Sequence, residues 1–112
     1  MMTETVKNII PRKFAENVQT AQYTAVDCKT YITKFTATNN SGSAAAFSVN
    51  LVPNGGAAST ANRVLNTRVI AVGECYICPE LVGQVLEAGG FISTLAGAAS
   101  TITISASGSE IT

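Results

Sequence analysis

The sequence of 112 residues contains no histidine and no tryptophan, and only 12% of its residues are charged. Soluble domains usually contain about 25% charged residues. Seven basic and seven acidic side chains give a net charge of zero, and zero net charge promotes association. Such a composition is typical of a β domain with a Ser/Thr/Asn-rich surface, or of a surface that other subunits cover. We favour the covered surface.

The missing histidine and the scattered carboxylates argue against catalysis. General acid–base chemistry usually needs His or a carboxylate pair with tuned pKa values. The acidic residues beyond the N-terminal region lie in separate segments, at Asp27, Glu74, Glu80, Glu87 and Glu110. No GxSxG motif occurs, and the Gly pairs at 55–56 and 89–90 lack the Lys of a phosphate-binding loop. The sequence predicts a protein that is not an enzyme, with no catalytic residue and no cofactor.

Three cysteines, Cys28, Cys75 and Cys78, are too few and odd in number for a secreted disulfide framework. A zinc site needs four ligands, usually Cys or His, and the chain has no His. In CYIC (75–78), two thiols three residues apart on a strand point to opposite faces and cannot bridge. We expect three free thiols packed as small hydrophobes, and no metal site.

The chain also lacks a basic stripe with interleaved aromatics and any apolar run of the ~18 residues that cross a bilayer. Its first residues, MMTETVKNII, place an acid where a signal peptide would be basic, and no apolar stretch follows. We therefore expect no nucleic-acid partner and no membrane partner. The expected location is the cytoplasm, or an assembly built there.

Residues 1–19 differ from the rest, because five of the fourteen charges fall there. Their first apolar residues have the spacing of one face of a helical turn, which Pro11 would end. We interpret residues 1–19 as an N-terminal arm outside a domain of residues 20–112, with a frayed terminus as the alternative. The predicted partner-binding residues of this arm are its apolar anchors and its basic pair: Val6, Ile9, Ile10, Arg12, Lys13 and Phe14.

The stretch TNNSGSAAAFSVNLVPNGG (38–56) resembles a flexible linker in composition, but its period is that of a strand. Residues 45–52 alternate, with Phe47, Val49 and Leu51 inward and Ser48 and Asn50 outward. Asn and Gly tolerate positive φ, so NNSGS and PNGG are typical turns. The preceding TYITKFTAT (30–38) predicts a strand with one face made of Tyr31, Thr33, Phe35 and Ala37.

Further short strands follow at regular spacing. The segment 63–72 predicts one face made of Leu65, Thr67, Val69 and Ala71, and VLEAGG, FISTLAG and TITISASG predict further strands and turns. About seven to nine short strands without a helix of usual length predict an all-β fold, a β-sandwich of jelly-roll or other Greek-key topology. The expected core consists of the larger apolar residues Phe35, Phe47, Leu51, Leu65, Ile77, Ile92, Ile102 and Ile104.

Three segments, TATNNSGSAAAFSVNLVPNGGAASTAN (36–62), GQVLEAGGFIS (83–93) and ITISASGSEIT (102–112), resemble a group of small all-β structural proteins of tailed bacteriophages. Those chains typically show a TNTSG-like turn, an AxFSVxLVP-like strand, a VLEAGD-like turn and a closing strand that ends in SGxEI. The likeness covers roughly residues 30–112 and leaves out the arm. Gly90 stands where an acid is common, and CYICPE has no counterpart.

The resemblance implies a virion component, and we favour a capsid decoration (cement) protein that binds and stabilises the major capsid protein lattice. It implies partners among the virion proteins, a homo-oligomer such as a trimer at a three-fold site, and a place in the capsid after assembly in the host cytoplasm. A neck, tail or baseplate adaptor, or a fibre-associated protein, is the alternative.

A third interpretation, from another class, is a carbohydrate-binding β-sandwich module. Stacking on sugar rings usually needs exposed aromatic side chains, and without Trp the strongest candidates are Tyr23, Tyr31 and Tyr76.

Overall fold

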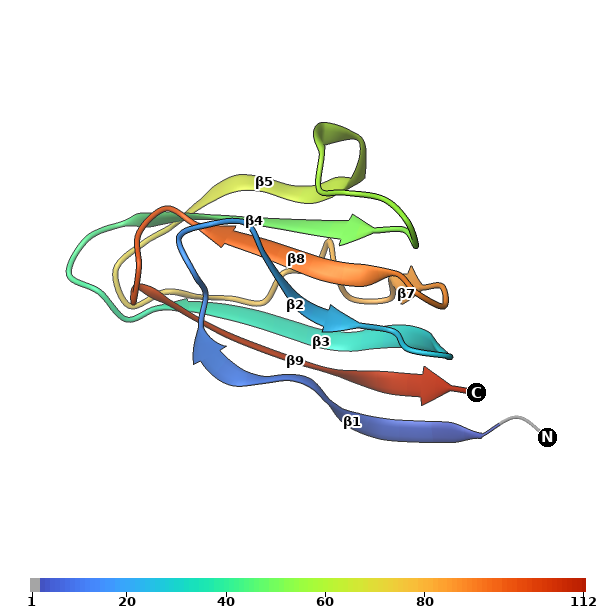
Figure 1. The fold of residues 1–112 in the computed structure, drawn as a ribbon. Helices are drawn as coiled ribbons and strands as arrows, with labels where there is room; N and C mark the ends of the chain where they lie inside the picture. The colour runs from blue at the N-terminus through green and yellow to red at the C-terminus, as the bar shows by residue number, and fades with distance from the viewer. Residues whose placement is uncertain (1–2) are drawn as a thin grey trace.

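The computed structural model describes residues 3–112, which form nine β-strands and, within that range, a single short 3-10 helix (Figure 1). The strands are β1 (Glu4–Phe14), β2 (Thr20–Thr24), β3 (Lys29–Asn39), β4 (Ala45–Val52), β5 (Arg63–Ile70), β6 (Cys75–Tyr76), β7 (Val85–Leu86), β8 (Phe91–Ala96) and β9 (Ile102–Ile111). The helix η1 spans Thr60–Asn62. The predicted all-β fold and its strand number are confirmed.

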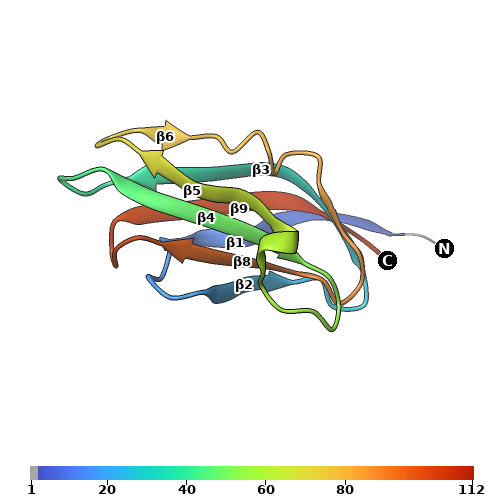
Figure 2. The ribbon, with the colours of Figure 1, turned by 90° about the horizontal axis from the view of Figure 1, so that it is seen from above.

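The strands form two antiparallel sheets that pack face to face (Figures 1 and 2). Sheet A has the order β1-β9-β3-β6, with β7 also pairing with β3, and sheet B has the order β2-β8-β4-β5. Four sets of pairs nest inside one another: β4 with β5, β3 with β6 and β7, β2 with β8, and β1 with β9. One long hairpin rolled up in this way, with its pairs alternating between two sheets, is a jelly roll.

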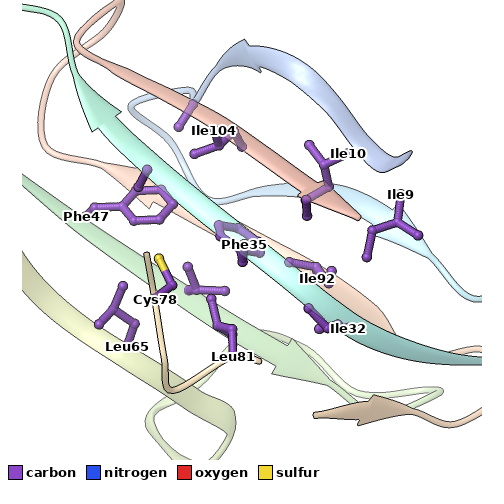
Figure 3. Close-up of a cluster of buried hydrophobic side chains, with 14 of the residues drawn as sticks. Ile9, Ile10, Ile32, Phe35, Phe47, Leu65, Cys78, Leu81, Ile92 and Ile104 are labelled. Atoms are coloured by element: carbon purple, nitrogen blue, oxygen red, sulfur yellow. The ribbon is translucent and has the colours of Figure 1, made fainter. Parts of the chain in front are cut away.

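The core lies between the sheets and is centred on Phe35 of β3 and Phe47 of β4, whose ring centroids are 6.4 Å apart (Figure 3). Both phenylalanines are fully buried. The expected core is confirmed at Phe35, Phe47, Leu65, Ile92, Ile102 and Ile104, while Leu51 is half-buried. Ile77 is 62% exposed, so its predicted burial is wrong. The next residue, Cys78, has φ of 48° and is buried in its place.

Residues 4–14 are a strand of sheet A, so the predicted arm outside the core is wrong for this range. Strand β1 pairs with β9 from Glu4 opposite Ile111 to Phe14 opposite Thr103. Residues 1 and 2 of the predicted arm lie outside the described residues. Because β1 belongs to the same sheet as β9 and β3, the predicted boundary at residue 19 does not separate the N-terminal region from the core.

The predicted helical turn is absent from residues 3–14 because a β-bulge produces the same apolar spacing. Two consecutive residues, Ile9 and Ile10, are both buried at 3% and 1% exposure, which a regular strand does not allow. The pairing with β9 shifts between Lys7 and Ile10 and again between Ile10 and Lys13. Pro11 lies within the second shift, and its missing N–H is tolerated because β1 is an edge strand.

A second bulge reverses the predicted face of the first half of β3. The pairing with β9 shifts between Ile32 and Lys34, so Ile32 is buried and Tyr31 faces outward. A Cβ atom at Gly108 would lie 2.4 Å from the carbonyl oxygen of Tyr31. The close approach of the two backbones therefore requires glycine at this position. Beyond the bulge, Phe35 and Ala37 are buried as predicted.

A third bulge makes the predicted face of residues 63–72 wrong beyond Leu65. Thr67 has φ of 50°, and its N–H donates to Ser48 Oγ at 2.8 Å. The pairing with β4 shifts at this point, so that Ile70 is buried and Val69 is 61% exposed. Ser48 was predicted to face outward but is almost fully buried. Its hydroxyl accepts the hydrogen bond of the Thr67 N–H at the bulge, in place of a backbone carbonyl group.

Asn39 holds together the end of the sandwich where β3 turns into β4. Its side chain is fully buried, and Nδ2 donates to the carbonyl oxygens of Ser43 and Ile70, both at 2.8 Å. Its Oδ1 accepts from the N–H of Ser41 at 2.9 Å. The predicted NNSGS turn is thus joined to the end of β5 in the other sheet.

Gly108→Ala should lower the free energy of unfolding by about 1–3 kcal/mol or more, the usual range for overpacking. The new methyl group would meet backbone rather than a flexible side chain. Urea unfolding followed by circular dichroism measures the effect. Gly42→Ala is the matched control, because no heavy atom lies within 4 Å of its added Cβ. Equal effects of the two substitutions would contradict a glycine requirement at the bulge.

Candidate binding surface

The face of sheet A that points away from the core, here called the outer face of sheet A, carries hydroxyl groups in its middle. Strand β9 alternates strictly, with Ile102, Ile104 and Ala106 buried in the core. The alternate residues face the other way: Thr103, Ser105 and Ser107, which are half-buried, and Ser109, which its neighbours cover to 4% exposure. Directly opposed residues of an antiparallel pair share a face, so the partners of these four residues also belong to the outer face.

One end of this face is a row of residues across four strands. Val6 of β1 lies opposite Ser109, Ser109 lies opposite Tyr31 of β3, and Tyr31 lies opposite Val85 of β7. Val6 is 76% exposed, Val85 48% and Tyr31 41%. The row covers three strand spacings, about 14 Å. The row presents three apolar side chains to the outside, with the nearly buried Ser109 between Val6 and Tyr31.

The other end of the face has a second row. Phe14 lies opposite Thr103, Thr103 lies opposite Thr38, and Thr38 lies opposite Cys75 of β6. Phe14 is half exposed, and Cys75 is exposed. An aromatic side chain therefore stands at the far edge of the same face as Tyr31.

Between the two rows lies a depression of about 240 Å³, here called the basic depression. It is lined by Asn8 and Arg12 of β1, Lys34 and Thr36 of β3, and Ser105, Ala106 and Ser107 of β9. Lys34 lies opposite Ser107, and Thr36 lies opposite Ser105. The cationic side chains of Arg12 and Lys34 thus line one depression, together with serine hydroxyl groups of β9.

The structure divides the six predicted partner-binding residues among three environments. Val6, Arg12 and Phe14 all lie on the outer face of sheet A, with Val6 and Phe14 at its two ends and Arg12 in the depression between them. Ile9 and Ile10 are core residues and are not available to a partner, which corrects their predicted role. Sequence reasoning missed Lys34 and Val85, and it considered Tyr31 only for sugar stacking, because these residues reach this face through strand pairing.

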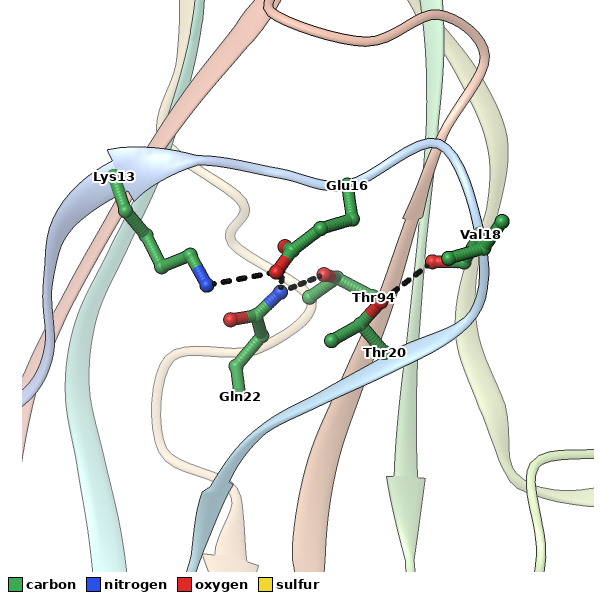
Figure 4. Close-up of polar contacts among 6 residues, drawn as sticks. All are labelled: Lys13, Glu16, Val18, Thr20, Gln22 and Thr94. Atoms are coloured by element: carbon green, nitrogen blue, oxygen red, sulfur yellow. Dashed lines mark hydrogen bonds and ion pairs between the residues drawn. The ribbon is translucent and has the colours of Figure 1, made fainter.

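Lys13, the sixth residue, belongs to a polar network at the crossing from β1 to β2 (Figure 4). Its Nζ donates to Glu16 Oε2 at 3.0 Å, and Gln22 Nε2 donates to Glu16 Oε1 at 2.8 Å and to Thr94 Oγ1 at 2.9 Å. The Gln22 hydrogen bond first, and Lys13 second, lower the pKa of Glu16 below its ordinary value. The predicted basic pair is therefore divided, since Lys13 pairs with Glu16 and Arg12 lines the depression.

Tyr23 connects the edge of sheet B to sheet A. Its hydroxyl donates to the carboxylate of Glu110 and shares a 2.7 Å hydrogen bond with Thr30 Oγ1. Glu110 also pairs with Lys7 Nζ at 3.5 Å. Burial first, and the Glu110 hydrogen bond second, raise the pKa of Tyr23 far above its ordinary value.

Tyr76 makes the corresponding connection at the opposite side of the sandwich. The guanidinium of Arg68 in β5 lies 4.2 Å from the centre of the Tyr76 ring. The Tyr76 hydroxyl donates to the Glu80 carboxylate at 2.6 Å. Burial and the Glu80 carboxylate raise the pKa of Tyr76 to about 12. Since Tyr23 and Tyr76 join the sheets and Tyr31 stands on the outer face of sheet A, the three tyrosines do not gather on one face.

A second depression, of about 300 Å³, lies on the outer side of sheet B beside Arg63. The guanidinium of Arg63 donates to the side-chain oxygens of Asn50 at 3.2 Å and of Asn66 and Gln19, both at 3.4 Å. Gln19 also donates to Ser93 Oγ at 2.8 Å. The charge of Arg63 is thus satisfied by three amide groups of its own chain.

All three cysteines are free, as predicted, but only two are packed. Cys28 and Cys78 are buried, whereas Cys75 is exposed, which corrects the expectation of three buried thiols. The pairing of Thr38 with Cys75 places this thiol on the outer face of sheet A. Burial first, and the Glu80 carboxylate second, raise the pKa of Cys78 to about 12.

Among residues 3–112, no three His, Cys, Asp or Glu side chains come together as a metal site. The same residues form no helix that is long and apolar enough to cross a membrane. Comparison of the chain with protein-family models, curated proteins and solved structures returns no match.

Ellman's reagent at pH 8 should react rapidly with one thiol per native chain and with three after unfolding, because only Cys75 is exposed. Cys75→Ser should remove the rapid reaction, and the control Cys28→Ser should keep it. More than one rapidly reacting thiol in the folded protein would contradict the burial of Cys28 and Cys78.

Proposed function

We propose that the protein is a non-enzymatic structural protein of a tailed-phage virion, and within that class a capsid decoration protein that binds and stabilises the major capsid protein lattice. The likeness of residues 36–62, 83–93 and 102–112 to small all-β phage structural proteins supports this class. The outer face of sheet A is the surface that contacts the lattice in this proposal. The protein would then act by binding and not by chemistry.

The composition of this face is the observation that carries the proposal. It presents exposed Val6, Tyr31 and Val85 at one end and Phe14 at the other, with two cations between them. In β1, β3 and β9, the residues from the first row to the second include no Asp or Glu. Protein interfaces are enriched in aromatic residues and Arg and depleted of acidic residues at their centres. The face matches this composition in its aromatic residues, its Arg and its lack of acidic residues, whereas Lys34 and the serines of β9 are of types that interfaces contain less often.

The low charge of the whole chain supports the same proposal. A surface with zero net charge associates more readily than a strongly charged one. We propose that several copies bind around symmetry axes of the capsid, with a trimer at a three-fold site. An adaptor or fibre-associated protein of the neck, tail or baseplate is the alternative location within the virion.

Copy number distinguishes the two locations. Virions of the phage that encodes the chain would be purified, and the protein would be counted against the major capsid protein by quantitative mass spectrometry. A capsid decoration protein should be present in hundreds of copies, and a tail protein in about six, twelve or eighteen, according to the symmetry of its site. Absence of the protein from purified virions would overturn the proposal as a whole.

Val6→Asp should weaken binding to capsids that lack the protein by about tenfold or more, since it buries an unpaired charge in the interface. Co-sedimentation with such capsids measures the affinity. Val26→Asp is the matched control, because Val26 is 69% exposed in the loop between β2 and β3. Urea unfolding checks that both variants fold. Equal binding of the two variants would show that the outer face of sheet A is not the contact surface.

A point substitution is preferable to deletion of residues 1–16. This deletion would remove β1 and its pairing with β9, together with the buried Ile9 and Ile10. A deleted protein that fails to bind would therefore reveal only that the sandwich is damaged. Val6 is 76% exposed, so its substitution changes the surface and leaves the core intact.

A further inference from the structure

We propose that the basic depression is an anion-binding site that receives a carboxylate side chain of the protein covering the outer face of sheet A. The inference rests on the proposed function, which supplies a protein partner for this face. The site would set which part of the partner surface meets the sandwich, because an acidic side chain must lie over Arg12 and Lys34.

The strands place donors on three sides of the depression. Arg12 and Asn8 come from β1, Lys34 from β3, and two serine hydroxyls from β9 between them. The hydroxyl of Thr36, which also lines the depression, already donates to the carbonyl oxygen of Ser105 at 3.5 Å. Since β9 separates the other two strands, the two cationic strands are about 10 Å apart. This width admits one carboxylate group between the cations. Ammonium, guanidinium, amide and hydroxyl groups can all donate hydrogen bonds to its oxygens.

The bulges of β1 contribute to this arrangement. The register with β9 is broken between Lys7 and Ile10 and between Ile10 and Lys13, so the segment that contains Asn8 and Arg12 is not held in regular pairing. A bulge bends a strand and changes the direction of its side chains. Asn8 and Arg12 can thus both line the depression, although Ile9 and Ile10 are both buried.

The contacts of the other basic side chains single out Arg12 and Lys34 as the two that can bind an anion from outside the chain. Three of the seven basic side chains form ion pairs, Lys7 with Glu110, Lys13 with Glu16 and Lys29 with Glu87. Arg63 donates to amide oxygens, and Arg68 stacks on Tyr76. Within residues 3–112, the side chains of Arg12 and Lys34 make no hydrogen bond, ion pair or cation–π contact. Two like charges that share one depression gain free energy from a bound anion.

The surroundings favour a protein carboxylate over a polyanion. The exposed side chains of Val6, Tyr31 and Phe14 lie on either side of the depression and would exclude water from a docked protein surface. Exclusion of water strengthens the attraction between Arg12 and a carboxylate. Nucleic acid requires an extended basic surface, whereas this face has two cations in a chain of zero net charge.

The double substitution Arg12→Gln with Lys34→Gln tests the site in the complete protein. Its affinity for capsids that lack the protein should fall by about tenfold or more, and the remaining binding should depend less on salt. The matched control, Lys13→Gln with Lys29→Gln, removes the same charge from residues that already have acidic partners. If the double variant and its control bind equally, the inference is overturned while the proposed function stands.

A titration without the partner separates the two proposals. Sodium acetate at constant ionic strength should cause saturable NMR shifts in the backbone amides of Thr36, Ser105 and Ser107, and the Arg12/Lys34 double variant should not show them. Sodium phosphate forms the second arm, and a stronger response to phosphate would overturn the assignment to a carboxylate. The absence of any saturable shift would overturn the anion site itself. Acetate binding by a protein that does not bind capsids would support the site and refute the proposed function.

Discussion

The pairing of β9 on both of its edges is the constraint on which the rest of the structure depends. Strand β9 pairs with β1 on one side and with β3 on the other, over almost its whole length. Its alternation sends Ile102, Ile104 and Ala106 into the core and the hydroxyl side chains to the outside. A shift of one residue would exchange the two faces. The register of β9 therefore determines both which of its side chains enter the core and which lie on the candidate binding surface.

The bulges of β1 and β3 then determine which side chains of these two strands face the core and which face outward beside β9. The close contact between Gly108 and the Tyr31 carbonyl group places Tyr31 outside and Ile32 inside. The bulges of β1 bury two consecutive isoleucines and bring Arg12 to the outer face. Bulges also make an edge strand a poor template for pairing with another chain. This favours the face of sheet A over the edge of β1 as the surface for the proposed partner contacts.

Polar contacts at the two open sides of the sandwich involve two of the three tyrosines and several of the charged side chains. Tyr23 and Glu110 connect the sheets on one side, and Arg68 and Tyr76 connect them on the other. Exposed ion pairs contribute little to stability, so their main effect here is to neutralise charge locally. What remains on the outer face of sheet A is a basic depression between exposed apolar side chains, which supports the proposed role of this face in binding.

The sequence by itself determined the all-β class and the approximate positions of β3, β4, β5, β7, β8 and β9, because alternation and turn residues are local properties. It did not locate β1, which was predicted as an arm outside the domain, or β2. Phe47 and Val49 kept their predicted inward direction, and β9 shows a regular period throughout its core-facing residues. The proposed phage function came from a resemblance and not from these local properties. Free thiols were also predictable, but the exposure of Cys75 was not, since it depends on pairing with Thr38.

Only the tertiary structure decided which side chains share a face in β1, β3 and β5. Each of these strands contains a bulge, and one extra residue reverses the direction of every side chain beyond it. Strand pairing also decided that Arg12 belongs with Lys34 and not with the adjacent Lys13. Neighbours across a sheet come from register, which is a property of two segments together, so neither segment alone could reveal the basic depression.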